Sequence, residues 1–323
     1  MAKIAIIGGG WVGCHLASKL KDKHDVVLFD KNERLFEETS SNNQNRLHLG
    51  FHYARSFKTR ELCRSTYNRF LHDYNKFTDV VTKNYYCVPN KSNIDFMTYL
   101  KIFDDFVWDL EAPPSCLMGI AGAINTQERY IDFRRVSEHF NTELRSISVQ
   151  KTIRSTDGLS AEFDLVINAT NNMLNSGEDS FFELTTTLMY TRLAKDLPFD
   201  ALTLVDGSFF SLYPYDHNRF SLTDVEHTPI AKFIDVESLR KFKLTAGSIT
   251  HIRDLMEAKA VSYYPEFLKH FAYDGYFTAV KSKPHSASAD RYPVVTVDGN
   301  VVSCYTGKIQ GVYVIEDQIL KML

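Results

Sequence analysis

The sequence predicts an α/β fold, α+β overall, in which a Rossmann-like dinucleotide-binding domain is joined to a second, mainly antiparallel β-sheet domain. Three observations lead to this prediction. A glycine-rich turn separates a buried strand from a helix at the start of the chain, an apolar strand recurs mid-chain, and other stretches are rich in aromatic and β-branched residues. With 323 residues, of which 44% are hydrophobic, the chain can fill two such units.

The start of the chain predicts one βαβ unit. Residues 3–7 form a buried strand, Gly8–Gly10 a turn, residues 11–20 a helix and residues 25–29 a second strand, which ends at Asp30. Because parallel strands need such a crossover helix, these elements open a parallel sheet.

The middle of the chain mixes helical and strand patterns. Apolar residues at spacings of three and four predict an amphipathic helix over 56–77, preceded by a loop at 38–55. Residues 80–88 and 184–225 have the composition of strands, and the turn signals in the second stretch favour an antiparallel meander. Helical patterning returns over 248–271.

Two later segments rejoin the first sheet. Residues 164–170 form a continuous apolar strand that ends in small polar residues, and residues 301–305, 306–307 and 311–323 repeat the opening order of strand, turn and helix. The first domain is therefore discontinuous. Its expected segments are 1–79, 120–172 and 286–323, and those of the second, substrate domain are 80–119 and 173–285.

Composition narrows the functional classes. The 37 Lys and Arg against 40 Asp and Glu give a net charge of -3, which disfavours nucleic acid and anionic lipid as partners. Five scattered cysteines without a Cys-x-x-Cys pair predict neither a disulfide framework nor a metal site, and favour a reduced, cytoplasmic setting. The apolar runs are too short to span a membrane. The expected partner is a small polar substrate.

The glycine turn has the spacing of a dinucleotide site. Gly8, Gly10 and Gly13 follow the pattern Gly-x-Gly-x-x-Gly between a strand and a helix, where they allow a tight turn, close approach to a pyrophosphate and contact between helix and strand. Asp30, 17 residues after Gly13, is placed to accept hydrogen bonds from ribose hydroxyls. This pattern leaves NAD and FAD as alternatives.

A polar stretch after Asp30 carries a family resemblance. Ser40-Ser41-Asn42-Asn43, then Arg46, then the run from His48 to Tyr53 resemble the D-amino acid oxidase and glycine oxidase superfamily, which includes sarcosine oxidases and 2-hydroxyglutarate dehydrogenases. The 164–170 strand is similar to a family strand ending Ala-Thr-Gly, with Asn171 in the place of the glycine. The segments 290–295 and 305–311 resemble the family's closing elements.

The resemblance implies noncovalent FAD and a set of site residues. As cofactor-binding residues it implies Gly8, Gly10, Trp11, Val12, Gly13, Asp30, Lys31, Ser41, Asn42, Asn43, Arg46, Leu47, Thr170, Gly307, Lys308 and Ile309. The catalytic candidates are Arg46 at the flavin N5 edge, His48 as a base, and Lys308, which with a helix N-terminus would stabilise the reduced flavin.

Each candidate has a structural alternative. Arg46 is the kind of residue that forms surface ion pairs, and His48 is equally consistent with a buried histidine bonded to backbone. His52 and Tyr53 fit plain packing. Tyr213 and Tyr215 would face one side of a strand and either cover the flavin or belong to the core. Lys281, Lys283 and Arg291 form a basic approach that would receive an anionic substrate or remain a solvated face.

The combined interpretation is an FAD-dependent oxidoreductase that oxidises a C–N bond of a small amine or amino acid by hydride transfer to flavin N5. Three alternatives stay open at this point: an FAD-dependent 2-hydroxy acid dehydrogenase, an NAD-dependent dehydrogenase and a flavin-binding protein without turnover. The electron acceptor is not determined by the sequence.

Overall fold

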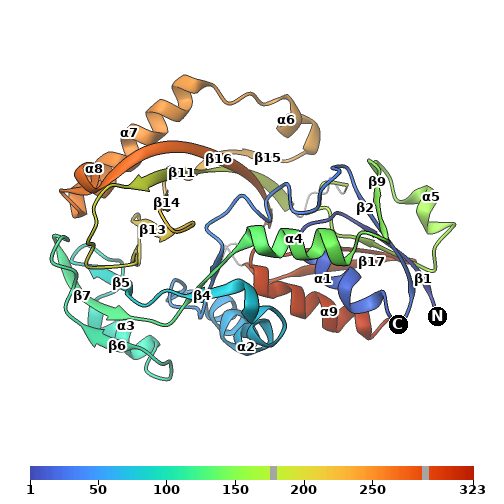
Figure 1. Ribbon diagram of the computed structural model, residues 1–323, viewed down its shortest axis with the longest axis horizontal. Helices are drawn as coiled ribbons and strands as arrows, with labels where there is room; N and C mark the ends of the chain where they lie inside the picture. Colours follow the sequence, from blue (N-terminus) through green and yellow to red (C-terminus); the bar gives the residue numbers. More distant parts are fainter. Residues whose placement is uncertain (175–179, 286–290) are drawn as a thin grey trace.

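A computed structural model describes residues 1–174, 180–285 and 291–323. Within this part of the chain, one sheet of six strands lies toward the end of the molecule that holds both termini, and a larger sheet lies toward the other end (Figure 1). No helix among the described residues is long and apolar enough to cross a bilayer. The mixed α/β fold confirms the predicted fold class.

The first sheet is parallel apart from one edge strand. Among the described residues its order is β17 (Val294–Asp298), β18 (Val301–Tyr305), β10 (Leu165–Asn168), β1 (Lys3–Ile7), β2 (Asp25–Asp30) and β9 (Ser148–Gln150), with β17 antiparallel to β18. β10 lies between β1 and β18 and is parallel to both, which confirms the predicted return of residues 164–170 to this sheet.

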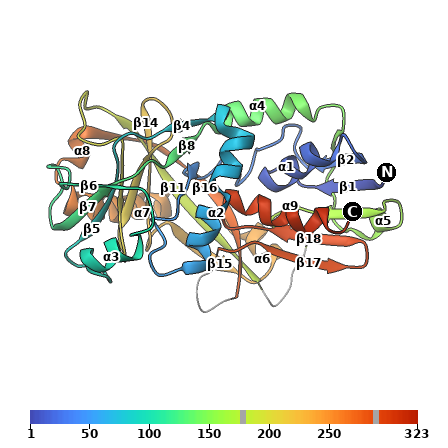
Figure 2. The ribbon, with the colours of Figure 1, turned by 90° about the horizontal axis from the view of Figure 1, so that it is seen from below.

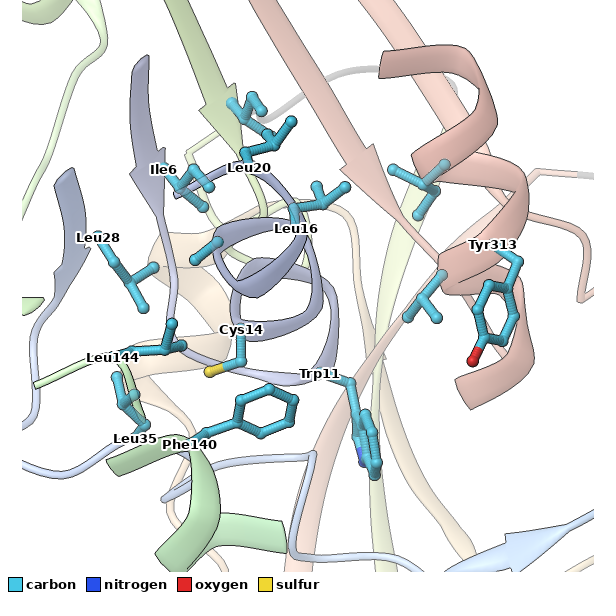
Figure 3. Close-up of a cluster of buried hydrophobic side chains, with 14 of the residues drawn as sticks. Ile6, Trp11, Cys14, Leu16, Leu20, Leu28, Leu35, Phe140, Leu144 and Tyr313 are labelled. Atoms are coloured by element: carbon cyan, nitrogen blue, oxygen red, sulfur yellow. The ribbon is translucent and has the colours of Figure 1, made fainter. Parts of the chain in front are cut away.

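Helices cover both faces of this sheet. On one face α1 (Trp11–Leu20), α4 (Phe133–Glu143) and α9 (Val312–Leu320) share a core with Ile6 and Leu28 of the strands (Figure 3). On the other face the short helix α5 (Asp157–Ser160) packs over a smaller cluster. The crossover through α1 is the connection that parallel strands require.

The larger sheet is mainly antiparallel. Among the described residues its order is β15 (Pro229–Phe233), β11 (Ser180–Arg192), β14 (Arg219–Asp224), β13 (Phe210–Pro214), β12 (Ala201–Leu204), β5 (Asn84–Pro89), β7 (Ile120–Asn125) and β6 (Asp109–Glu111), and β16 (Phe271–Pro284) also pairs with β11. Helices α6 (Val236–Lys241), α7 (Ala246–Tyr263) and α8 (Phe267–His270) lie on the outer side of β11 and β16, and α3 (Phe96–Ile102) contacts β7 (Figure 1).

A small sheet joins the two large ones. It consists of β3 (Arg46–Leu47), β8 (Arg129–Ile131) and β4 (Thr78–Val80), with α2 (Phe57–Tyr74) close to α9 (Figure 2). Two 3-10 turns, Asn75–Phe77 and Ile309–Gly311, follow α2 and precede α9. This arrangement places the 46–53 segment, inside the loop expected at 38–55, next to the turn before α9.

Several predicted elements differ in detail. The expected strand over 80–88 is two strands, β4 and β5, which belong to different sheets. The stretch 184–225 is not a simple meander, because β11 pairs with β14 rather than with β12. The helix expected over 248–271 divides into α7 and α8.

The expected domain boundaries stay predictions. β7, which falls in the segment 120–172 expected to bind the cofactor, pairs with β5 and β6 in the larger sheet. The boundary at 286 and the motif residue Asp290 lie outside the described residues.

Candidate cofactor and substrate site

The three glycines of the first turn have different surroundings. Gly8 has a φ of +106°, and a Cβ atom on it would lie 2.7 Å from the backbone oxygen of Ala169. A Cβ on Gly13 would collide with the Gly8 carbonyl. A Cβ on Gly10 would meet only the Ser40 side chain, with Oγ at 2.7 Å. Gly8 and Gly13 are therefore required by the backbone, whereas Gly10 leaves space in front of the α1 N-terminus.

Asp30 closes the same turn from the end of β2. Its carboxylate accepts hydrogen bonds from the backbone N–H of Gly9 at 2.6 Å and of Asn32 at 2.8 Å. The backbone N–H of Trp11 donates to Ser40 Oγ at 2.9 Å. The N-terminus of α1, Asp30 and Ser40 thus meet at one edge of the parallel sheet, where this type of fold binds pyrophosphate and ribose.

The other predicted cofactor residues lie around this edge in varied roles. The indole of Trp11 packs in the same core as Phe140 (Figure 3). Phe36 also contacts the indole, and Leu47 is fully buried. Val12 and Ile309 pack against the same core. Lys31 forms an ion pair with Glu38, and Ser41 Oγ donates to the Glu38 carbonyl. The other three side chains also donate hydrogen bonds: Asn42 to the Thr278 carbonyl, Asn43 to the Thr39 carbonyl and Thr170 to the Asn168 side chain.

Asn171 stands where the family has a glycine. Its φ is +55°, in the left-handed region where glycine is favoured and asparagine is the best tolerated alternative. Its side chain donates to the Val280 carbonyl at 2.8 Å, and its carbonyl accepts from Ser282 Oγ. The substitution therefore keeps the backbone conformation and adds a link to β16.

Arg46 is buried, only 5% exposed, and is not the surface ion pair that was its structural alternative. Its Nη1 donates to Ser211 Oγ at 2.8 Å, and its Nη2 donates to Tyr86 Oη at 2.8 Å and to Glu128 Oε2 at 3.3 Å. The centroid of the Tyr213 ring lies 4.1 Å from the guanidinium carbon. These five residues are called the Arg46 cluster below.

Strand pairing brings Glu128 to this position. In the antiparallel ladder of β3 and β8, Arg46 pairs with Tyr130 and Leu47 with Arg129, so the next pair in register would be His48 and Glu128. Glu128 Oε1 accepts the backbone N–H of Leu49 at 2.7 Å. The ladder therefore carries a buried carboxylate to the residues that the sequence singled out.

His48 is held neutral. Its Nδ1 lies 3.7 Å from Glu128 Oε1, too far for a normal hydrogen bond. Burial, and then the charge of Lys308, lowers the pKa of His48 to about 3, although Glu128 acts in the opposite direction. Its ring contacts those of His52 and Tyr53 at centroid distances of 6.2 and 5.7 Å. Burial also lowers the pKa of His52.

Lys308 belongs to a group of four cations, called the lysine cluster below, whose members are Lys281, Lys283, Arg291 and Lys308. Its Nζ lies 4.5 Å from the centroid of the Tyr53 ring, and burial, with Arg291 and Arg46, lowers its pKa to about 7. Burial, Arg291 and Lys283 lower the pKa of Lys281 to about 8.

One carboxylate in the described part of the chain faces this group. Glu183 pairs across the strands with Lys281 and forms an ion pair with Lys283. The lysine cluster is thus Lys281, Lys283, Arg291 and Lys308, with a single acid. All four side chains are partly buried, so the predicted basic approach is not a fully solvated face.

Gln310 connects the lysine cluster to the 46–53 segment. Its Nε2 donates to the carbonyl oxygens of His48 and of Cys63, both at 2.8 Å. The side chain is almost fully buried. Lys308 and His48, which are far apart in the sequence, are therefore held beside each other by the residue two positions after Lys308.

Sequence reasoning missed several residues of this site: Tyr86, Glu128, Ser211 and Gln310. The signal for Glu128 was weak, because a single acid between a polar turn and a short strand resembles many surface acids. Tyr213 does lie against Arg46, whereas Tyr215 follows the end of β13 and packs on Phe133 and Phe277.

The donor set fits a large polar cofactor. Buried side-chain atoms without a hydrogen-bond partner concentrate between residues 45 and 52: both amide atoms of Asn45, Nε of Arg46, and Nδ1 of His48 and His52. Buried polar atoms normally have partners, so a bound molecule is the expected source of them. Two surface cavities of about 380 and 420 Å³ lie elsewhere and are not lined by Arg46, His48 or Lys308. The fold and the first turn define a dinucleotide-binding α/β protein.

Comparisons with known proteins specify the family. Residues 3–86 match the FAD-dependent oxidoreductase (DAO) family. FAD-dependent monooxygenase FPY4 of Fusarium mangiferae is 33% identical over 99% of this chain and 90% of that protein. FAD-dependent monooxygenase kojA of Aspergillus flavus is 25% identical over 99% and 85%.

Solved structures agree on the fold. Glycine oxidase from Geobacillus kaustophilus has a TM-score of 0.73 at 12% identity, covering 99% of this chain and 93% of that one. L-α-glycerophosphate oxidase from Mycoplasma pneumoniae, determined with FAD bound, has a TM-score of 0.69 at 14% identity, covering 100% and 94%. The chain belongs to the family of FAD-dependent oxidoreductases, and its cofactor is FAD rather than NAD.

Proposed function

We propose that the protein oxidises a C–N bond of a small amine or amino acid that carries an anionic group. The lysine cluster supports this substrate class, because its four cations have one neighbouring carboxylate among the described residues, and such a balance favours a bound anion. The nearby Arg46 cluster contains its own counter-ion and does not require one from a ligand.

In this proposal, two groups of residues bind different parts of the cofactor. The turn from Gly8 to Gly13 and Asp30 hold the adenosine and pyrophosphate, and the 46–53 segment and Lys308 face the flavin ring. When bound, FAD accepts a hydride at N5 and gains negative charge near N1 and O2.

Lys308 is the proton acceptor in this proposal. A pKa of about 7 leaves Lys308 partly unprotonated at neutral pH, whereas His48, with a pKa of about 3, holds a proton poorly. Lys308 takes a proton from the substrate ammonium, and the neutral amine can then release hydride. The resulting Lys308 cation stabilises the negative charge that reduction creates nearby. His48 contributes as a neutral imidazole that donates or accepts a hydrogen bond.

Lys281 and Arg291 orient the substrate through its anionic group. Lys281 lies on β16 of the larger sheet, whereas Arg291 lies just before β17 of the first sheet, so an anion would bridge the two sheets. The same arrangement also accepts a 2-hydroxy acid, whose hydroxyl proton would pass to Lys308.

The test is anaerobic reduction of the purified FAD protein. Amino acids, N-substituted amino acids, uncharged amines and 2-hydroxy acids are added separately, and the flavin absorbance is followed. The proposal expects rapid bleaching by an amine that carries a carboxylate or another anionic group, and slower bleaching by its amide. Bleaching by 2-hydroxy acids alone would transfer the proposal to C–O oxidation, and equal rates for charged and amide forms would contradict the role of the lysine cluster.

Monooxygenation is the second candidate, because the relative that is 33% identical over nearly the whole chain is named an FAD-dependent monooxygenase. This reaction needs an external reductant and places an oxygen atom in the product. Reduction of the flavin by NADPH without substrate, followed by incorporation of labelled oxygen from O₂, would favour it. Reduction by substrate alone would favour the oxidation of a C–N bond.

A further inference from the structure

Glu128 is a buried carboxylate surrounded by donors. Its side chain is 0% exposed and accepts hydrogen bonds from Tyr86 Oη at 2.7 Å and from the backbone N–H of Leu49 at 2.7 Å. Arg46 Nη2 lies 3.3 Å away, and Tyr86 also accepts a hydrogen bond from this nitrogen. Arg46, Tyr86 and Glu128 thus form a closed triangle of polar contacts.

The triangle keeps both charges in place. Burial alone would raise the pKa of Glu128, but this pKa is held well below its usual range, and the charge of Arg46 and the hydrogen bond from Tyr86 are among the interactions that lower it. A buried ion pair is stable only while both members and their hydrogen bonds are present. Glu128 and Arg46 are therefore charged together, and their sum is zero.

Arg46 cannot hold a substrate carboxylate with its two terminal nitrogens. Both already donate, Nη1 to Ser211 and Nη2 to Tyr86 and Glu128, while the ring of Tyr213 covers the guanidinium. Only Nε has no partner. A bidentate grip on an anion would require the triangle to open.

We propose that Glu128 is a positioning residue that fixes Arg46 and cancels its charge, so that the positive charge acting on the flavin and on the substrate comes from the lysine cluster alone. This inference rests on the proposed function, in which the 46–53 segment and Lys308 face the flavin ring. It assigns Arg46 a role in shape and hydrogen bonding through Nε, and leaves anion recognition to Lys281 and Arg291.

The two-electron midpoint potential of bound FAD tests the charge balance. It is measured with a chemical reductant at one pH and salt concentration in the FAD-loaded wild type, in Glu128→Gln and in the double variant Glu128→Gln/Arg46→Met. Glu128→Gln leaves the Arg46 charge uncompensated, so the equilibrium constant for reduction should rise about tenfold, or about 30 mV. The double variant removes both charges, so its equilibrium constant for reduction should lie within about threefold of the wild-type value.

Opposite results overturn the inference. An unchanged or lowered potential in Glu128→Gln would show that its carboxylate does not compensate Arg46. If this single variant does not fold, the double variant decides alone: a potential clearly below that of the wild type would show that Arg46 acts as an unpaired cation. A generally disturbed site would shift both variants in the same direction, which also contradicts the inference.

Lys308→Met separates this inference from the proposed function. If Glu128→Gln and Lys308→Met both leave the potential unchanged, the flavin lies near neither Arg46 nor Lys308, and both proposals fail. If only Lys308→Met shifts it, the role of Glu128 alone is wrong. If the potentials follow the expected pattern but no amine bleaches the flavin, the proposed substrate class is wrong, and the role of Glu128 stands.

Discussion

The Arg46 cluster and the lysine cluster differ in how their charges are balanced. In the first, one cation is paired with one buried carboxylate, and hydroxyl groups complete the contacts. In the second, four cations have one described acid between them, and the pKa values of Lys281 and Lys308 are depressed to about 8 and about 7. Compensated charge holds a geometry, whereas uncompensated charge leaves a site that an anion would stabilise.

The largest expected effect is the loss of bound FAD, without which neither cluster can act on a flavin. Gly10→Val places a branched side chain before the N-terminus of α1, where only Ser40 lies near, so we expect a folded protein without FAD. Gly13→Ala is the control, because its methyl group collides with the backbone and should lower stability instead. Flavin content by absorbance and unfolding by circular dichroism check both; full FAD content in Gly10→Val would contradict the site.

Breaking the Arg46 cluster should cost stability. Glu128→Ala leaves Arg46 buried without its counter-ion, and the free energy of unfolding should fall by about 3 to 5 kcal/mol. Urea unfolding of the apoprotein measures this. Glu111→Ala is the control, since this partly exposed acid bonds to Tyr85 and Asn125 without a cation. Equal losses of unfolding free energy in the two variants would show that the buried ion pair stabilises the protein no more than a partly exposed acid does.

Removing one cation from the lysine cluster should act on the flavin. Lys308→Met makes reduction less favourable by on the order of 1 to 3 kcal/mol, or about 20 to 65 mV for a two-electron couple. A redox titration of both forms at one pH and salt concentration checks the sign. An unchanged or higher potential in the variant would mean that Lys308 does not face the reduced flavin.

A second cation of the cluster should act on substrate affinity. Lys281→Met is expected to raise KM for an anionic substrate about tenfold, or about 1.4 kcal/mol, with a smaller change in kcat. The control is Lys243→Met, a change in an exposed cation outside the cluster. If KM for an uncharged analogue rises as much, the loss reflects packing rather than charge.

The last expected effect is a pH dependence of stability. Lys308 and Lys281 bind protons less tightly in the folded protein than their ordinary value of 10.5, so between pH 7 and 10.5 the unfolded chain holds more protons. The free energy of unfolding of the apoprotein should therefore rise with pH in this range. Below about pH 7 both states are protonated, so the destabilisation by these two lysines is complete and the pH dependence that they cause ends. A flatter profile in Lys308→Met would agree; an identical profile would contradict the assignment.

The sequence predicted those parts that depend on neighbouring residues. The strand, turn and helix from Lys3 to Leu20, and the acid at Asp30, follow from local spacing, because a tight turn and a parallel crossover impose their pattern within a few residues. The expected strand at 80–88 failed for the opposite reason. β4 and β5 follow each other closely along the chain, and their pairing with different sheets separates them.

The sequence by itself determined the dinucleotide turn, the two-sheet α/β class and the polar segment that contains Arg46 and His48. Only the tertiary structure decided which of their charges are compensated. Glu128 reaches Arg46 across 82 residues through the pairing of β3 with β8, and Gln310 reaches His48 across 262 residues. Such contacts leave no local pattern, because burial and charge balance depend on which strands meet after folding.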